Sequence, residues 1–172
     1  MEALDYHLLN IAVLTVSDTR TEETDTAGKL LVDRLQDASH QLAEKAIIAD
    51  NQYQIRAKIS QWIAAEEVHA IITTGGTGLT GRDITPEAIM PLLDKEIPGF
   101  GELFRQISYG FIKTSTIQSR AFAGLANGTA IFSLPGSPGA CKDGWDNIIC
   151  YQLDIRHTPC NLVELMPRFM EK

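Results

Sequence analysis

One stretch of the chain, residues 73–87, combines glycines, hydroxyl groups and a carboxylate in a spacing that suits anion binding. Its four glycines are Gly75, Gly76, Gly78 and Gly81. Glycines lack the Cβ atoms that keep another molecule away from the main chain, and amides freed in such a turn can converge on an anion. Thr85 is expected to cap a helix whose first position is Pro86, so the positive end of that helix points back at the glycines. The stretch therefore predicts a phosphate site.

Carboxylates stand in similar positions elsewhere, since Asp18 and Asp50 each follow an apolar run and Asp83 follows the glycines. Asp50 and Asp83 can share Mg²⁺ with a polyphosphate, because one or two carboxylates plus phosphate oxygens usually hold this ion. Two simpler roles stay open at this point, a helix cap for Asp50 and a turn residue for Asp83. Arg82 either neutralises a phosphate or is a solvated surface arginine.

Two familiar nucleotide motifs do not account for these glycines. Gly76-x-Gly78-x-x-Gly81 matches the dinucleotide fingerprint, but that motif needs its helix to begin within the glycines, and here Pro86 delays it. A Walker A loop needs a Lys-Ser or Lys-Thr pair after the glycines, which this sequence lacks. A nicotinamide-dependent oxidoreductase is therefore a weak alternative.

The elements that position these residues alternate along the chain. Apolar runs at residues 10–16, 41–48 and 70–74 predict strands, the first and third buried on both faces. Helices are expected after Asp25 or Thr26, with Leu30, Leu31 and Leu35 inward, then over about 51–66 and 85–93. Another should follow Pro98-Gly99, with Leu103, Phe104 and Ile107 inward.

The remaining third of the chain has a different pattern. Residues 120–126 and 129–134 flank Asn127-Gly128, a strong signal for a β-hairpin. Ser137 and Pro138 should open a last major helix, and residues 161–166 a short terminal one. We thus expect one domain over residues 1–172, with a loosely ordered arm at 1–9. Its fold class is an α/β three-layer sandwich (α/β/α) with a mainly parallel, mixed sheet.

Ligands of open α/β sheets bind beyond the carboxyl ends of the strands. Four polar loops are expected there, at residues 17–19, 49–51, 75–83 and 135–139, and three of them carry a carboxylate. The net charge of −7 argues against a nucleic-acid partner. No apolar run approaches the length of a membrane span, and the first residues lack the features of a signal peptide. With three cysteines and no C-x-x-C pair, we expect reduced thiols and a cytoplasmic location.

Five ordered motifs carry a resemblance to a known family. They are Thr73-Thr74-Gly75-Gly76-Thr77-Gly78, Arg82-Asp83-Ile84-Thr85-Pro86-Glu87, Pro98-Gly99-Phe100-Gly101-Glu102, Ser119-Arg120-Ala121 and Leu134-Pro135-Gly136-Ser137-Pro138. Together they resemble the MoaB/MogA family of molybdenum cofactor biosynthesis, over about residues 11–153. Thr114-Ser115-Thr116, Gln152-Leu153-Asp154 and Pro159-Cys160-Asn161 are closer to the MoaB branch.

The resemblance implies a molybdopterin-binding domain. Enzymes of the MogA type join the terminal phosphate of molybdopterin to the AMP part of Mg-ATP and release pyrophosphate. By position, Asp50 and Asp83 match the catalytic, metal-holding carboxylates. The residues expected to bind molybdopterin and ATP are Ser17, Asp18, Gly75, Gly76, Thr77, Gly78, Arg82, Ser119, Arg120, Pro135, Gly136, Ser137 and Pro138.

An alternative from another class is a non-catalytic carrier or scaffold that binds molybdopterin within the same pathway. Two metal-ready carboxylates favour the enzyme, since a carrier has no need of them. The resemblance also implies a homo-oligomer, a trimer or hexamer, and contacts with other proteins of the same pathway. Residues 100–117 hold more large apolar side chains than one short helix can turn inward, which agrees with an interface between copies.

Overall fold

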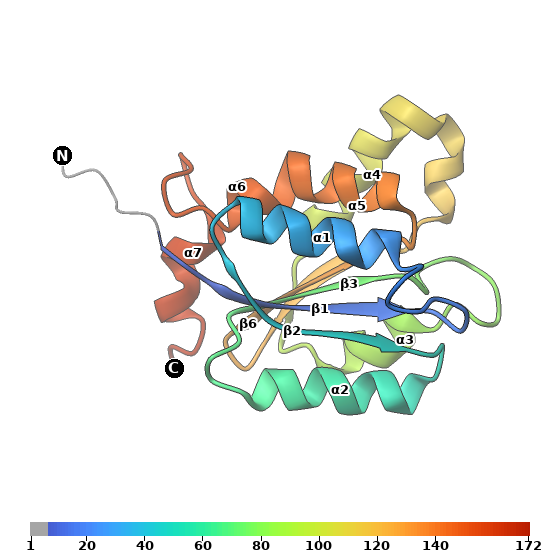
Figure 1. Ribbon diagram of the computed structural model, residues 1–172. Helices are drawn as coiled ribbons and strands as arrows, with labels where there is room; N and C mark the ends of the chain where they lie inside the picture. The colour runs from blue at the N-terminus through green and yellow to red at the C-terminus, as the bar shows by residue number, and fades with distance from the viewer. Residues whose placement is uncertain (1–6) are drawn as a thin grey trace.

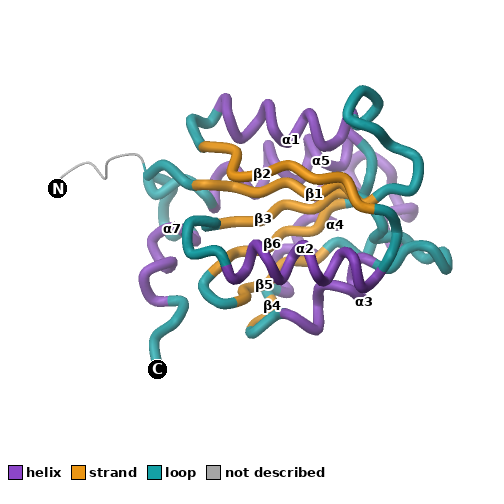
Figure 2. Tube along the Cα trace, turned by 60° about the horizontal axis from the view of Figure 1, so that its bottom comes forward, coloured by secondary structure: helices purple, strands orange, loops and turns teal. Residues whose placement is uncertain are grey.

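The computed structural model describes residues 7–172, which form one six-stranded sheet with helices on both faces (Figures 1 and 2). The strand order is β2-β1-β3-β6-β5-β4. The strands are β1 (Asn10–Val16), β2 (Gln41–Ile48), β3 (Ala70–Thr74), β4 (Lys95–Glu96), β5 (Phe122–Ala126) and β6 (Thr129–Leu134). The pairs β2–β1, β1–β3 and β3–β6 are parallel, whereas β5 pairs antiparallel with both β6 and β4. The predicted α/β sandwich with a mainly parallel, mixed sheet is confirmed.

Helices cover the sheet in two layers. The helices are α1 (Thr26–Asp37), α2 (Gln52–Ala64), α3 (Thr85–Ile89), α4 (Pro98–Ile112), α5 (Pro138–Gly144), α6 (Cys150–Gln152) and α7 (Leu162–Leu165). Shorter turns complete them: η1 (Met90–Leu92), η2 (Lys113–Gln118), the π-helical η3 (Trp145–Ile149) and η4 (Met166–Arg168). In Figure 1, α1, α4 and α5 lie above the sheet and α2 and α3 below it. None of the helices within residues 7–172 is long and apolar enough to cross a membrane.

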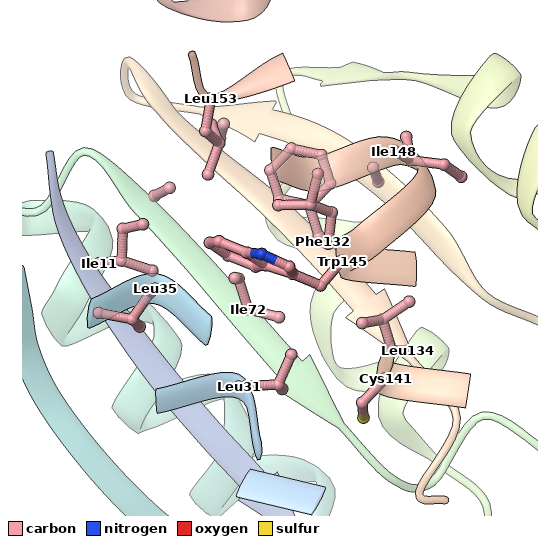
Figure 3. Close-up of a cluster of buried hydrophobic side chains, with 14 of the residues drawn as sticks. Ile11, Leu31, Leu35, Ile72, Phe132, Leu134, Cys141, Trp145, Ile148 and Leu153 are labelled. Atoms are coloured by element: carbon pink, nitrogen blue, oxygen red, sulfur yellow. The ribbon is translucent and has the colours of Figure 1, made fainter. Parts of the chain in front are cut away.

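Strand β1 shows why the two layers form. Its side chains alternate between two separate clusters of buried residues, so that Ile11 and Val13 face one and Ala12 and Leu14 face the other. The first cluster lies under α1 and α5, where Trp145 packs among aliphatic residues of the strands and helices (Figure 3). The second lies between the sheet and α2. A strand that is apolar on both faces can only be buried in the middle of such a sandwich.

The hairpin signal and the helix starts predicted from the sequence are present. Asn127 and Gly128 both have positive φ, 48° and 81°, as the tight turn between β5 and β6 requires. Asp25 caps α1, and its side chain accepts a hydrogen bond from the Gly28 amide. Ser137 caps α5 in the same way through the Ala140 amide.

Three expectations need correction, and one strand was not predicted. Thr85 is the first residue of α3, not its cap, which is Ile84. Leu103 is 43% exposed because α4 turns Phe100 and Phe104 to the sheet instead. The expected arm at residues 1–9 lies outside the described residues at 1–6, and Leu9 is fully buried in the core. The short edge strand β4 was not predicted, since two residues give no periodic signal.

Candidate functional site

An open cleft of about 600 Å³ lies at the carboxyl ends of β1, β2, β3 and β6. These strand ends point to the right in Figure 1, where the loops that follow them gather. The predicted site residues in its lining are Ser17, Asp18, Asp50, Gly75, Gly76, Thr77, Gly78, Arg82, Asp83, Ser119, Pro135, Gly136 and Ser137. Two predicted residues, Arg120 and Pro138, are not in the lining. Four loops that are distant in the sequence therefore meet at one place, as the parallel sheet requires.

The glycine loop begins with a sharp turn that only glycine adopts easily. Gly75 and Gly76 have φ values of 100° and 70°, in the left-handed region. The Gly75 amide donates to Leu134 O (3.0 Å), which ties the loop to the end of β6. Thr85 holds the other side, because its hydroxyl donates to Gly75 O (2.8 Å) and its amide to Gly76 O (3.0 Å). The buried Thr85 hydroxyl thus braces the turn instead of capping the helix.

In the direction of a Cβ atom, three of these glycines meet the protein itself. A Cβ on Gly75 would lie 2.2 Å from Val16 O, and one on Gly76 would lie 2.3 Å from Thr85 Oγ1. A Cβ on Gly78 would lie 2.7 Å from an Asp83 carboxylate oxygen. The fold of the loop therefore requires glycine at these positions, in addition to the ligand access expected from the sequence.

The two carboxylates expected to share a metal face the same loop. A Cβ on Gly76 would lie 3.4 Å from Asp50 Oδ1, and the Asp83 carboxylate lies beside Gly78. The open question of a helix cap is settled by Asn51, whose side chain accepts from the amides of Tyr53 and Gln54, so Asp50 does not cap α2. Both carboxylates are therefore directed to the cleft.

Asp50 and Asp83 differ in their electrostatic environment. Burial, reinforced by the nearby charge of Asp83, raises the pKa of Asp50. Burial also acts to raise the pKa of Asp83, but hydrogen bonds from the Thr80 hydroxyl (2.8 Å) and amide (2.9 Å) outweigh it, so this pKa is lowered. Asp83 thus serves the turn, the simpler of the two roles considered from the sequence, and it also lines the cleft.

Polar residues of the loop after β1 also line the cleft. Ser17 Oγ accepts hydrogen bonds from the amides of Thr19 and Arg20, which closes a tight turn. Asp18 accepts from the Asp50 amide (3.0 Å) and pairs with the exposed Arg82 guanidinium. Asp18 therefore connects three of the four loops.

The loop after β6 closes the remaining side. Gly136 packs on the glycine turn, since a Cβ placed on it would lie 3.2 Å from the Gly75 Cα. Thr74 donates to Pro135 O (2.9 Å), and the buried Cys141 thiol donates to Thr74 Oγ1 (3.1 Å). Burial raises the pKa of Cys141 to about 12, so this thiol stays protonated and structural.

Sequence reasoning missed part of the lining. Asp25 was recognised only as a helix cap, yet it lies in the lining and is 3% exposed. It accepts from Thr15 Oγ1 (2.7 Å) and pairs with Lys45 (3.0 Å), a strand residue that no local pattern connects to it. Phe104, Ser108 and Ile112 of α4 also line the cleft. Only the tertiary structure brings that helix to the cleft.

The donor set suits a magnesium ion carried by a polyphosphate. The cleft lining contains four aspartates, Asp18, Asp25, Asp50 and Asp83, against two arginines, Arg20 and Arg82. Within residues 7–172 no three histidine, cysteine or acidic side chains are grouped so that they could hold a metal alone. Two carboxylates completed by phosphate oxygens are a usual arrangement for Mg²⁺, and the mutual repulsion that raises the pKa of Asp50 would be relieved by it.

This chain is similar in sequence to proteins of one known family. A family model described as a probable molybdopterin binding domain matches residues 12–155. The molybdenum cofactor biosynthesis protein B of Escherichia coli K12 is 55% identical over 151 residues, 88% of this chain and 89% of that protein.

Solved structures agree with this match. A crystal structure of a molybdenum cofactor biosynthesis protein B superposes with a TM-score of 0.83 at 42% identity, covering 86% of this chain and 92% of that one. The tungsten cofactor synthesizing protein MoaB of Pyrococcus furiosus gives a TM-score of 0.75 at 36% identity, covering 83% and 91%. The chain therefore belongs to the MoaB/MogA family of molybdenum cofactor biosynthesis proteins and is similar to its MoaB branch.

Proposed function

We propose that this protein acts in molybdenum cofactor biosynthesis, where it binds molybdopterin and joins its terminal phosphate to the AMP part of Mg-ATP. The observation that carries the proposal is that Asp50 and Asp83 both lie next to glycines of the glycine loop, in one cleft with the Pro135–Ser137 turn. Family membership and the relatives' names support the pathway. The adenylyl transfer is what the resemblance to the MogA type implies, and the carboxylates and glycine loop of the cleft suit it.

In the proposed reaction, an oxygen of the molybdopterin phosphate forms a bond to the α-phosphorus of ATP. The bond from that phosphorus to the bridging oxygen breaks, and pyrophosphate leaves with its electron pair. The attacking phosphate is already ionised at neutral pH, so no side chain has to remove a proton. Catalysis then depends on positioning and on neutralising phosphate oxygens.

The residues of the cleft divide these tasks. Asp50 and Asp83 would hold Mg²⁺, which when bound neutralises charge on the phosphate oxygens. Arg20 and Arg82 are the two arginines of the lining, and their charge can attract a phosphate. Because the lining is net negative, metal-free ATP should bind poorly. The nucleotide is therefore expected to enter as its magnesium complex.

The test is direct. The purified protein is incubated with molybdopterin, ATP and MgCl₂, and adenylated molybdopterin and pyrophosphate are measured. We expect turnover in the wild type and a loss of about 10²-fold or more in Asp50→Ala and Asp83→Ala, if these carboxylates hold the neutralising ion. Molybdopterin binding without product would instead support the carrier alternative, and wild-type rates in both variants would refute the roles assigned to the aspartates.

We also propose that the protein is a trimer or a dimer of trimers. Large apolar side chains of α4 and η2 are exposed, with Phe111 at 68% and Ile117 at 78%, and exposed apolar patches of this kind usually mark interfaces. Light scattering should give three or six times the chain mass of 18.9 kDa, and a single species at that mass would contradict the proposal. The proposed use of ATP agrees with the cytoplasmic location expected from the sequence.

A further inference from the structure

Arg120 is bound to the glycine loop and not to the cleft. Its Nε donates to Gly78 O (2.8 Å) and its Nη2 to Asp83 O (2.8 Å), while its amide donates to Thr77 O (2.9 Å). Arg120 is not in the cleft lining, in contrast to Arg20 and Arg82. One guanidinium thus holds the start and the end of the segment that carries Asp83.

Glu87 fixes the outer edge of the same guanidinium. Both Nη1 and Nη2 of Arg120 contact the Glu87 carboxylate, the latter at 3.3 Å from Oε2. The hydrogen bond from Arg120 lowers the pKa of Glu87, so this carboxylate is ionised at neutral pH. A two-pronged contact of this kind restricts the orientation of the planar guanidinium as well as its distance.

The segment held by Arg120 is organised around the Asp83 side chain. Asp83 accepts from the amide and hydroxyl of Thr80, and its own amide donates back to Thr80 O (3.0 Å). Gly78 lies directly against this carboxylate. A shift of the Gly78 or Asp83 carbonyl would therefore move the carboxylate relative to Asp50.

We propose that Arg120 and Glu87 are a positioning pair that fixes the Asp83 carboxylate opposite Asp50, and that Arg120 does not bind substrate phosphate. This inference rests on the proposed function where it concerns turnover, but the placement of the loop is independent of the reaction. It revises the substrate-binding role that the family resemblance implies for Arg120.

A lysine cannot replace this arginine. Its ammonium group is a single point, whereas the guanidinium reaches two carbonyls and a carboxylate from one plane. Arg120→Lys keeps the charge but loses at least one anchor of the loop. Glu87→Gln is a milder variant that removes the ionic partner and leaves the arginine in place.

Arg34→Lys provides a matched control. Arg34 pairs with Asp146 through Nε (2.8 Å) and Nη2 (3.3 Å), and its side chain is 32% exposed, close to the 31% of Arg120. This pair lies between α1 and η3, and neither residue is in the cleft lining. Any general effect of losing a two-pronged arginine contact should appear equally in this control.

One measurement needs no substrate. Amide hydrogen exchange at Thr80 and Asp83, followed by NMR, should accelerate about 10-fold or more in Arg120→Lys and by less in Glu87→Gln. Arg34→Lys should match the wild type. Unchanged exchange in both site variants would overturn the proposal.

Kinetics separate positioning from phosphate binding. A displaced Asp83 carboxylate lowers kcat by about 10- to 100-fold and changes KM for Mg-ATP by less than about fivefold, because Asp50 would still hold the ion in the ground state. A raised KM with unchanged kcat would identify Arg120 as a phosphate ligand and refute the pair. A wild-type protein without turnover would refute the proposed function only, and amide exchange would still decide the inference. If Arg120→Lys does not fold, Glu87→Gln gives the decision.

Discussion

Gly76→Ala tests whether the glycine loop is shaped for the fold or kept open for a ligand. Gly76 has a φ of 70°, a conformation that costs an alanine about 1–2 kcal/mol. Its new Cβ would lie 2.3 Å from Thr85 Oγ1. Thr85 is fully buried, so it can move away only by giving up its hydrogen bond to Gly75 O.

The magnitude follows from these two terms. A buried hydrogen bond that is lost with its partners unsatisfied costs about 1–3 kcal/mol. Together with the backbone term, Gly76→Ala should lower the free energy of unfolding by about 3 kcal/mol. For a chain of this length the melting temperature should fall by about 6–12 °C.

Gly81→Ala is the control on the same loop, because no heavy atom lies within 4 Å of its Cβ position and its φ is not in the left-handed region. It should melt within about 2 °C of the wild type. The assay is thermal unfolding by circular dichroism at fixed protein concentration, since association would raise the melting temperature. A Gly76→Ala variant that melts like the wild type but no longer binds Mg-ATP would show that the Cβ obstructs only the ligand.

Two further predictions concern regions outside the cleft. Burial lowers the pKa of His40 to about 4, with Asp154 acting to raise it and His7 to lower it, so the folded state favours the neutral ring that accepts from the Leu9 amide. The stabilisation from neutral His40 is present above about pH 6.5 and is lost as the pH falls toward 4. In urea unfolding, the free energy of unfolding should fall by about 2 kcal/mol between pH 7 and pH 5, and by less in His40→Gln. An equal fall in the variant would contradict the prediction. Phe111→Glu should convert a trimer or hexamer to a species of 18.9 kDa in light scattering, and an unchanged assembly would remove this residue from the interface.

Local patterns predicted most of the fold. Strand β3 follows from a run of β-branched residues, and the β5–β6 turn from Asn127-Gly128, because each signal lies within a few neighbouring residues. The meeting of four loops also followed, since parallel strands bring their carboxyl ends to one edge. The prediction that Leu103 points inward was wrong, because helical periodicity identifies an apolar face but not which part of that face a neighbouring element covers.

The site was harder to predict because its contacts are long-range. Threonine is a common helix cap, yet the Thr85 hydroxyl donates its hydrogen bond to the Gly75 carbonyl, ten residues earlier in the chain. Arginine is a common phosphate ligand, yet the Arg120 guanidinium donates hydrogen bonds to the carbonyls of Gly78 and Asp83, which lie 42 and 37 residues away in the chain. The residue type shows which hydrogen bonds a side chain can make, but only the tertiary structure determines which partner lies within reach.

The two carboxylates of the cleft, Asp50 and Asp83, have different surroundings. Asp83 is held by Thr80 and, through the main chain, by Arg120, and these contacts keep its pKa low. No other described residue is recorded as donating a hydrogen bond to the Asp50 carboxylate, and burial and the charge of Asp83 raise its pKa. A divalent cation would therefore meet one carboxylate already fixed in place and a second whose charge is relieved by binding. That asymmetry makes Asp83 the anchor of the proposed metal site and Asp50 the group whose ionisation the metal stabilises.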